Sequence, residues 1–519
     1  METPAGTERP RGWAVALLIF AVLLIPLWAG FDAPGVAMDE GMVLLYPELL
    51  LRGKLPYRDF ETFYAPGNLW LLAGAYSIFG AHVDVERSVG LLYRLALLGG
   101  LFLVLRRWSL VAAAGGLFVA MMFLAASGLV AFAWFGGVAF ALASVLLLAA
   151  KESVWRVPAA GLLAAAALLY RQDLAPAVLA SAAPLLLRMP ARERLKYFGA
   201  LTLGLMPLAI LAFSAGLQLT FENLFTYPVI ISNPGRRLPL SFSPFQVQMM
   251  FYLHLLVCAV NLAAGAMLTW KGRGGVNGRL FLSVAFLGAG LTHQALQRAD
   301  IVHVVLTAFF SLALLPTALL ILSTSRGVAR SHPAWAWGAA AFVLIAVLAS
   351  APILGTKLIK LTQHTVGVAP LAIEVAVRDR HFPYHGIALQ TQEVLTYLEK
   401  HSRPQQRLFV GTSDLRRTFA GDTFIYHLLP WLTPATYFLE LNPLSANRPG
   451  SRLASDVASA DWLVLNQVWD DSGEPNLSRQ AGSDAPNEVV RTQFELRKVA
   501  LPYLVFQRKA ARELQQSEL

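Results

Sequence analysis

Residues 88–127 read SVGLLYRLALLGGLFLVLRRWSLVAAAGGLFVAMMFLAAS. Two apolar runs, 88–105 and 109–127, are separated there by a short turn containing Arg106 and Arg107. Each run approaches the ~20 residues that an α-helix needs to cross the hydrocarbon core of a bilayer. Paired arginines between two such runs are typical of a cytoplasmic turn. The stretch therefore predicts two membrane-spanning helices joined by a short loop.

Comparable apolar runs recur through the first two thirds of the chain. Hydrophobic residues make up 56% of the 519 residues and charged residues only 14%, a balance that excludes soluble, collagen-like and disordered chains. We therefore predict an α-helical polytopic membrane protein with about 11 transmembrane helices, the two above included. The other runs lie at about 12–31, 134–150, 157–170, 174–187, 197–217, 248–270, 279–296, 301–322 and 334–353.

One apolar segment is too short to be counted as a span. Residues 66–80, PGNLWLLAGAYSIFG, cover about half a bilayer and are more typical of a re-entrant or interfacial helix. The first outer loop then extends from residue 32 to residue 87, long enough to carry several short helices against the membrane surface. Loops of this length in compact proteins are usually functional.

The last third of the chain has a different composition. Residues 353–519 hold 18 Lys and Arg and 17 Asp and Glu, whereas the longer segment 1–352 holds 24 and 15. Short helical and extended patterns alternate in this part, which predicts a transmembrane domain at 1–353 followed by a soluble α/β domain at 354–519. The helical patterns lie at 391–401 and 451–460, and the extended ones at 407–411, 435–441, 461–466 and 503–508.

The distribution of charge predicts the orientation. With a cytoplasmic N-terminus, 15 of the 24 Lys and Arg in residues 1–352 fall on the cytoplasmic side, together with only four of the 15 acidic residues. An odd number of spans then places the C-terminal domain outside the cytoplasm. Because most of the net charge of +10 lies in the loops of the membrane part, it argues against a nucleic-acid partner. The single cysteine, Cys258, excludes disulfides within the chain.

Adjacent carboxyl groups follow the first span, at Asp39 and Glu40. Ionisable groups at a bilayer surface cost free energy unless they are paired or used. These two could act as a general base toward an acceptor hydroxyl or as ligands for a divalent cation. The alternative is an acidic turn at the interface with no role in chemistry.

Arg171 and Asp173 lie at the outer end of the fifth span. The guanidinium would present a planar pair of donors at the depth of a lipid phosphate, and Asp173 could hold it or bind a substrate hydroxyl. An arginine that only anchors the helix end at the interface is an equal alternative.

Arg298, Asp300 and His303 crowd into the short connection between the ninth and tenth spans. The three groups could bind a phosphate or a sugar, or form a structural ion pair. Arg87 and Arg94 are two helical turns apart, so both lie on one face of the second span, with Arg94 deeper by roughly 10 Å. Arg94 could pair with a carboxylate of the first outer loop or reach a lipid phosphate from below.

The order of these motifs resembles the GT-C superfamily of integral-membrane glycosyltransferases. Within it, the chain is similar to the polyprenyl-phosphate-sugar branch that includes protein O-mannosyltransferases and aminoarabinose transferases. The likeness covers about residues 10–330. The family often has an acidic residue in the second outer loop, whereas residues 127–134, SGLVAFAW, have none. The motifs that carry it are Asp39-Glu40, the segment 66–80 followed by Glu86-Arg87, the turn Arg106-Arg107, and Arg171-Gln172-Asp173.

The resemblance implies an inverting transfer at the outer face of the cell (inner) membrane, periplasmic in a bacterium. The donor would be a sugar on a polyprenyl monophosphate, and the acceptor a lipid, glycan or protein hydroxyl. Asp39 would remove the acceptor proton, with Glu40 as the weaker catalytic alternative. Arg171, Arg94 and Arg298 would bind the donor phosphate. Substrate binding is assigned to Tyr64, Arg87, Asp173, Asp300 and His303.

No metal or cofactor is expected, because lipid phosphate is a good leaving group and the chain has one acidic pair and no DxD motif at this site. Three other functions stay open. A glycan polymerase or ligase differs mainly in its acceptor, a transporter or flippase would more often show internal repeats, and a structural assembly protein would use the C-terminal domain for docking. Nucleotide-binding and HExxH motifs do not occur in the sequence.

Overall fold

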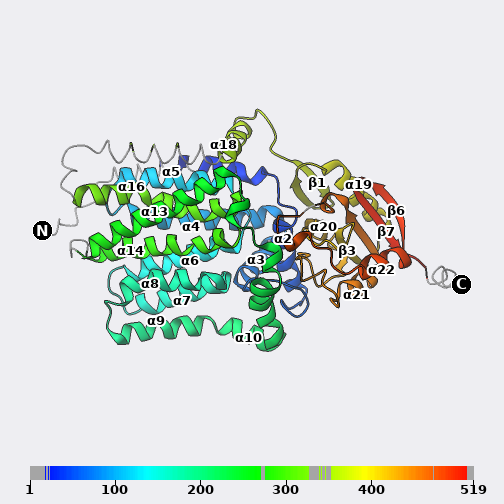
Figure 1. Ribbon diagram of the computed structural model, residues 1–519, viewed down its shortest axis with the longest axis horizontal. Coiled ribbons are helices and arrows are strands. Elements are labelled where there is room, and N and C mark those ends of the chain that lie inside the picture. The colour runs from blue at the N-terminus through cyan, green and yellow to red at the C-terminus, as the bar shows by residue number, and fades with distance from the viewer. Residues whose placement is uncertain are drawn as a thin grey trace.

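The computed structural model describes residues 24–270, 275–325, 352–471 and 473–510, with a few single positions before residue 24 and between 326 and 351. The molecule is elongated, and Figure 1 shows a bundle of roughly parallel helices at one end and an α/β region at the other. The helix labelled α2 lies where the two parts meet. The core is continuous across this boundary, because buried apolar residues of the bundle and of the α/β region belong to one cluster.

The helices of the bundle coincide with the predicted apolar runs. Among the described residues, five stretches are long and apolar enough to cross a membrane: Val83–Leu105, Ala191–Ala215, Phe245–Trp270, Gly275–Gln297 and Ile301–Ser323. Leu110–Ala126, Ala133–Leu148 and Arg156–Tyr170 are shorter apolar helices. The bundle elements are α4 (Val83–Leu105), α5 (Leu110–Ala126), α6 (Ala133–Leu148), α7 (Arg156–Tyr170), α8 (Ala175–Leu186), α9 (Ala191–Gly204), α10 (Met206–Ala215), α13 (Phe245–Trp270), α14 (Gly275–Gly290), α15 (Thr292–Gln297) and α16 (Ile301–Ser325).

One predicted span, 334–353, lies largely outside the described residues, and so does nearly half of another, 12–31. The membrane-protein fold and its helical bundle are therefore confirmed, while the count of about 11 spans stays a prediction.

The first outer loop carries short helices, as its length suggested. They are the 3₁₀ turn η1 (Ala29–Asp32), α2 (Asp39–Leu51) and α3 (Gly67–Phe79). Helix α3 covers the segment predicted to be re-entrant or interfacial, and it ends at Gly80, whose φ of +86° suits a residue without a side chain.

A second irregular connection joins α10 to α13. Its elements are α11 (Leu217–Phe221), the π-helix η3 (Glu222–Ile231), α12 (Asn233–Arg236) and the 3₁₀ turn η4 (Leu240–Phe242). Leu238 forms an isolated β-bridge with Arg298. The Pro/Gly-rich part of this connection is therefore held against the turn between α15 and α16.

The α/β region follows α18 (Pro352–Thr365) and contains a five-stranded sheet of order β4-β3-β5-β7-β6. Strands β4, β3 and β5 are parallel, and β7 pairs antiparallel with β5 and β6. A separate hairpin pairs β1 with β2. The bounds are β1 (Ile373–Val377), β2 (Arg380–Tyr384), α19 (Ala388–His401), β3 (Arg407–Thr412), α20 (Phe424–Leu428), β4 (Thr433–Pro434), α21 (Leu453–Ala458), β5 (Trp462–Asn466), the 3₁₀ turns η6 (Gln467–Trp469) and η7 (Leu477–Arg479), α22 (Ala485–Gln493), β6 (Phe494–Ala500) and β7 (Tyr503–Arg508).

Most of the predicted elements of this region are present, but the extended pattern at 435–441 is not a strand. Only Thr433 and Pro434 pair with β3. Beyond them the backbone is bound by other partners: the Tyr437 N–H donates to the Asp456 carboxylate at 2.9 Å, and the Tyr437 carbonyl accepts from the Glu61 N–H at 2.9 Å. The apolar alternation reflects burial between the two parts of the molecule and not a sheet.

The α/β region presses directly on the start of α2. The Phe424 N–H donates to the Ala37 carbonyl at 3.1 Å, and the Gly35 N–H donates to the Pro383 carbonyl at 2.7 Å. A Cβ on Gly41 would overlap the backbone of Phe424. The backbone that leads into α2 is thus fixed by residues nearly 400 positions away in sequence.

Candidate functional site

Helix α2 begins with Asp39 and Glu40, and its geometry directs their two carboxyl groups into different surroundings. Consecutive residues of an α-helix point about 100° apart. Asp39 is partly exposed, whereas Glu40 is fully buried. Because the surroundings remove water, the pKa of Asp39 is raised, although the charges of Arg236, His303 and Arg298 act against the rise. Asp39 therefore lies within the electrostatic influence of Arg236 and Arg298, and Glu40 faces the bundle.

Glu40 forms a buried ion pair with Arg87. The Arg87 Nε and Nη2 donate to the two Glu40 oxygens at 2.8 and 3.1 Å, and Nη1 donates to the carbonyls of Phe31 and Ala33 at 2.5 and 2.8 Å. Both side chains are almost completely excluded from solvent. The pair ties the first outer loop to α4, so we do not place Glu40 or Arg87 among the groups that meet substrate.

Arg94 is also enclosed within the bundle. Its Nη1 donates to the carbonyls of Gly90 and Val130 at 2.8 and 3.2 Å, and its guanidinium lies 4.2 Å from the centre of the Phe135 ring. The side chain is 0% exposed. The structure thus separates Arg87 and Arg94 from Asp39, although the sequence pattern grouped them.

Arg171 and Asp173 form a bidentate pair between α7 and α8. Arg171 Nε and Nη2 donate to the two Asp173 oxygens at 2.9 and 2.6 Å. Asp173 also contacts His293 at 3.3 Å and accepts from the Gln294 amide. Burial raises the pKa of Asp173, but Arg171 and His293 outweigh it and hold that pKa well below its usual range. Asp173 is therefore an ionised holder of Arg171.

Tyr64 lies beneath the same guanidinium. The Arg171 guanidinium stands 4.6 Å from the centre of the Tyr64 ring and 5.6 Å from that of Trp134. Burial raises the pKa of Tyr64, and the charge of Arg171 opposes the rise. Two predicted residues from distant loops, Tyr64 and Arg171, are thus brought together by ring stacking and charge.

Arg298 and His303 also gather around one carboxylate, that of Asp300. Arg298 Nε donates to Asp300 at 2.6 Å, and His303 Nδ1 lies 2.8 Å from the other Asp300 oxygen. Burial raises the pKa of Asp300, but His303 and Arg298 outweigh it and lower that pKa to about 2. The rest of the Arg298 fork is bound by Glu474 at 2.6 Å and by the Arg236 carbonyl at 3.0 Å.

Arg236 and three carboxylates also belong to this neighbourhood, and the sequence patterns did not assign the carboxylates, Glu61, Glu440 and Glu474, to a site. Arg236 lies 3.8 Å from Glu440, whose carboxylate also accepts from the Tyr46 hydroxyl at 3.1 Å. Glu61 binds Ser445 and Asn442. Burial raises the pKa of Glu440, and raises that of Glu61 to about 7. Glu440 and Glu474 come from the α/β region, so that region contributes to the same polar cluster as Asp39.

We call the group formed by Asp39, Tyr64, Arg171, Arg236 and Arg298, with their carboxylate partners, the outer cluster. It combines one partly exposed carboxyl group of raised pKa with two guanidinium groups, those of Arg171 and Arg298, that are held by ionised aspartates. Such a set can accept a proton at Asp39 and stabilise an oxyanion nearby. Among the described residues, no group of three or more His, Cys, Asp or Glu side chains has the arrangement of a metal site.

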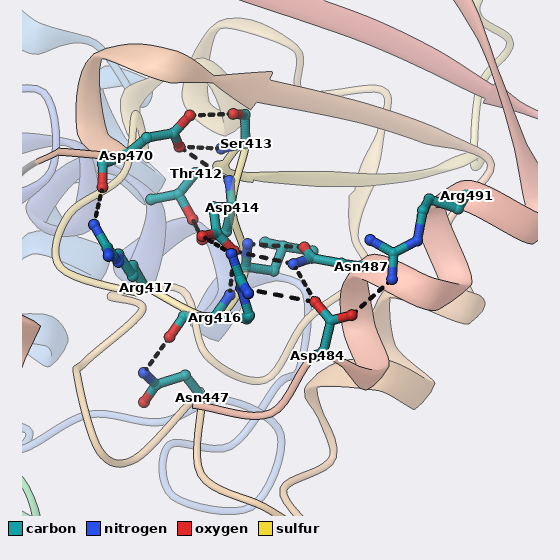
Figure 2. Close-up of polar contacts among 11 residues, drawn as sticks. Thr412, Ser413, Asp414, Arg416, Arg417, Asn447, Asp470, Asp484, Asn487 and Arg491 are labelled. Atoms are coloured by element: carbon teal, nitrogen blue, oxygen red, sulfur yellow. Dashed lines mark hydrogen bonds and ion pairs between the residues drawn. The ribbon is translucent and has the colours of Figure 1, made fainter. Parts of the chain in front are cut away.

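A second polar cluster lies at the carboxyl end of β3, and Figure 2 shows its side chains bound to one another. Asp470 accepts from Ser413, and Asp414 binds Arg416 and Asn487 at 2.9 and 3.0 Å. The contacts fasten the loop after β3 to the start of α22. Because its carboxylates are bound by partners within the cluster, we assign it to the scaffold.

The fold was compared with known proteins. Two crystal structures of ArnT from Cupriavidus metallidurans match almost the whole chain. The structure bound to undecaprenyl phosphate has a TM-score of 0.54 and 13% sequence identity, covering 97% of this chain and 99% of that one. The apo structure has a TM-score of 0.51 and 14% identity, covering 96% and 98%. The chain has the ArnT fold.

This likeness confirms the predicted architecture, with the helical bundle and the α/β region in one ArnT-like arrangement. At such low identity it concerns the fold, and the residues of the site are judged on their own geometry. Protein-family models and curated proteins gave no match to the sequence.

Proposed function

We propose that this protein is a membrane glycosyltransferase that transfers a sugar from a polyprenyl monophosphate to an acceptor hydroxyl. The observation that carries the proposal is the ArnT fold over 97% of the chain, in a structure whose counterpart is bound to undecaprenyl phosphate. The outer cluster supports it, because a base and several guanidinium groups converge there. The undecaprenyl phosphate bound to the ArnT counterpart supports the choice of donor, and the acceptor hydroxyl is proposed because Asp39 can accept its proton.

Asp39 serves as the general base. The acceptor oxygen forms a bond to the anomeric carbon while the bond from that carbon to the phosphate oxygen breaks, and the acceptor proton passes to Asp39. A single displacement of this kind inverts the configuration at the anomeric carbon. The raised pKa of Asp39 brings its basicity closer to that needed near neutral pH.

The departing lipid phosphate is stabilised by guanidinium groups. Arg171 uses Nε and Nη2 on Asp173, which leaves its Nη1 side for a phosphate oxygen. Arg298 and Arg236 supply further positive charge, and Asp300 fixes the orientation of Arg298. Tyr64 supports the Arg171 guanidinium and can bind a sugar hydroxyl, as can His303.

The reaction takes place at the outer face of the membrane. The proposal rests on the charge of the loops, since Lys and Arg concentrate on the opposite side of the predicted spans. The α/β region would then lie outside the cytoplasm beside the outer cluster, to which it contributes Glu440 and Glu474.

The test is a donor panel. Membranes that contain the protein are incubated with radiolabelled sugars on undecaprenyl or dolichyl monophosphate, and with the matching sugar nucleotides as the control donors. We expect label in a lipid, glycan or protein product only from a polyprenyl-phosphate donor, and none in membranes without the protein. Transfer from sugar nucleotides alone would refute the lipid donor. The absence of transfer from every donor would refute the proposed glycosyltransferase activity.

A further inference from the structure

A groove of about 450 Å³ runs along the boundary between the first outer loop and the α/β region. One side is built by residues 49–60, which include the end of α2 and the turn after it. The other side is built by residues 405–407, 433–439 and 452. We call it the boundary groove. It therefore exists only because the two regions are docked together.

The charges that line the boundary groove are unbalanced. Lys54 and Arg58 contribute from the first outer loop, and Arg407 and Arg452 contribute from the α/β region. Asp59 is the one acidic side chain among the lining residues. Arg58 is paired with Asp59, and Arg452 with Asp456 at 3.0 Å, so Lys54 and Arg407 supply the net positive potential that favours an anion.

The cations keep hydrogen-bond donors for a ligand. Arg407 donates Nη2 to the Ala435 carbonyl at 3.2 Å, and Arg58 uses Nε and Nη2 on Asp59. A guanidinium has five N–H donors, so both retain unused ones. Lys54 is exposed, and its ammonium can turn toward the groove.

The groove also lies at the level of a membrane boundary. Leu55 and Tyr57, next to Lys54 and Arg58, pack against Leu211 and Ala215. Ala215 is the last residue of a stretch long and apolar enough to span the membrane. The cations are thus placed where the headgroups of a lipid leaflet begin.

The groove lies beside the outer cluster at two places along the chain. Phe60 and Leu439 line the groove, whereas their neighbours Glu61 and Glu440 are buried on the other side. The groove and the outer cluster are therefore adjacent but separate.

We propose that the boundary groove binds the phosphate group of an anionic amphiphile that resides in the membrane. Charge-assisted hydrogen bonds from Lys54 and Arg407 would hold the phosphate from two sides, and the acyl chains would remain in the adjoining leaflet. This inference does not depend on the proposed transfer reaction. The same chemistry could recognise a soluble phosphate ester, and the experiment separates the two sources.

The full-length protein in non-ionic detergent is titrated with phosphatidic acid, phosphatidylcholine, glucose 6-phosphate and inorganic phosphate, and bound ligand is counted by native mass spectrometry. We expect phosphatidic acid to bind and the other three to bind far more weakly. The double variant Lys54→Glu, Arg407→Glu should weaken phosphatidic acid binding about tenfold or more. Lys400→Glu, at an exposed lysine of α19 outside the groove, is the matched control and should bind like the wild type.

Lys54→Gln with Arg407→Gln repeats the test without adding charge, should the first variant fold poorly. Equal binding of phosphatidic acid by wild type and both double variants would overturn the site. Glucose 6-phosphate binding as tightly as phosphatidic acid would overturn the membrane source, while its sensitivity to the same variants would support the phosphate site. Because no sugar transfer is measured, failure here leaves the proposed function standing, and failure of the donor panel leaves this site standing.

Discussion

Asp39 and Glu40 are adjacent in sequence and end in opposite environments. Glu40 enters the bundle, where Arg87 and two backbone carbonyls complete a closed, water-free network. Asp39 enters the outer cluster, where its partners act through charge and where space remains accessible. A structural ion pair needs all of its hydrogen bonds satisfied within the protein. A general base needs a carboxylate that is near positive charges but not bound by them. The difference teaches that an acidic pair at a membrane surface can divide between stability and chemistry.

The largest effect should follow from breaking the closed network. Arg87→Met leaves the Glu40 carboxylate buried without a counter-charge, and removing one partner of a buried pair costs about 3–5 kcal/mol. We expect a marked fall in the yield of folded protein and in the apparent unfolding temperature in detergent. Arg58→Met removes an exposed arginine and should leave both unchanged. Equal stability of the two variants would show that the Glu40 pair is not structural.

A smaller loss should follow from changing the open cluster at Arg171. Arg171→Lys keeps the positive charge but loses the parallel donors to Asp173 and to a phosphate. We expect transfer to fall about tenfold, the equivalent of one charge-assisted hydrogen bond, and to fall further in Arg171→Ala. The rates are measured per folded protein. Full transfer by both variants would reduce Arg171 to an interfacial anchor.

The substitution Gly41→Ala should loosen the docking of the α/β region against α2. Alanine normally stabilises a helix relative to glycine by roughly 0.5–1 kcal/mol. At this position the added methyl group overlaps the Phe424 backbone, so we expect a net destabilisation of about 1–3 kcal/mol and slower transfer. Gly74→Ala in α3, where a Cβ meets open space, is the control and should be neutral or stabilising. Equal effects at both positions would argue against close docking.

The smallest effect concerns pH. Glu48 accepts from Arg380 at 2.6 Å and lies 2.6 Å from His427 Nδ1, linking α2 to the α/β region. Burial raises the pKa of Glu48, but His427 and Arg380 outweigh it, and the net pKa lies below the usual value. Its stabilising contribution is therefore present above the pKa of the unfolded chain, about 4.3, and is lost as the pH falls through the lower folded value.

The unfolding temperature of the wild type should accordingly exceed that of Glu48→Gln at neutral pH, and the difference should shrink below about pH 4.3. Glu399→Gln, at an exposed pair with Arg378, should follow the wild type throughout. A constant gap between wild type and Glu48→Gln would mean that this contact is not linked to protonation.

The sequence predicted the elements better than the contacts among them. The apolar runs predicted α4 to α10 and α13 to α16 because a helix that crosses a bilayer must be apolar along its length. The segment 435–441 was misread because its apolar residues are buried by docking and not by sheet pairing. Glu440 and Glu474 could not be assigned to the site, because no local sequence pattern indicates contacts over such long separations. Their partners Tyr46 and Arg298 lie 394 and 176 residues away in the chain.

The sequence pointed to most of the ionisable residues of the outer cluster, but it did not show which of the candidate residues belong to the cluster and which are buried in the bundle. Asp39, Arg171 and Arg298 were selected by their positions in loops between spans, because a charge at a membrane surface costs free energy unless it is paired or functional. The same rule also selected Arg87 and Arg94, which are buried by tertiary packing. Only the direction in which each side chain leaves its helix separates the two groups.

The turnover of Asp39→Asn with a polyprenyl-phosphate sugar is the most direct test of the proposed general base. The amide keeps the shape of the side chain and removes its basicity. We predict that the variant folds, binds the lipid-linked donor and retains the wild-type unfolding temperature, while its turnover falls about 100-fold to 10,000-fold. Near wild-type turnover by Asp39→Asn would contradict the assignment of the base and, with it, the catalytic role of the outer cluster.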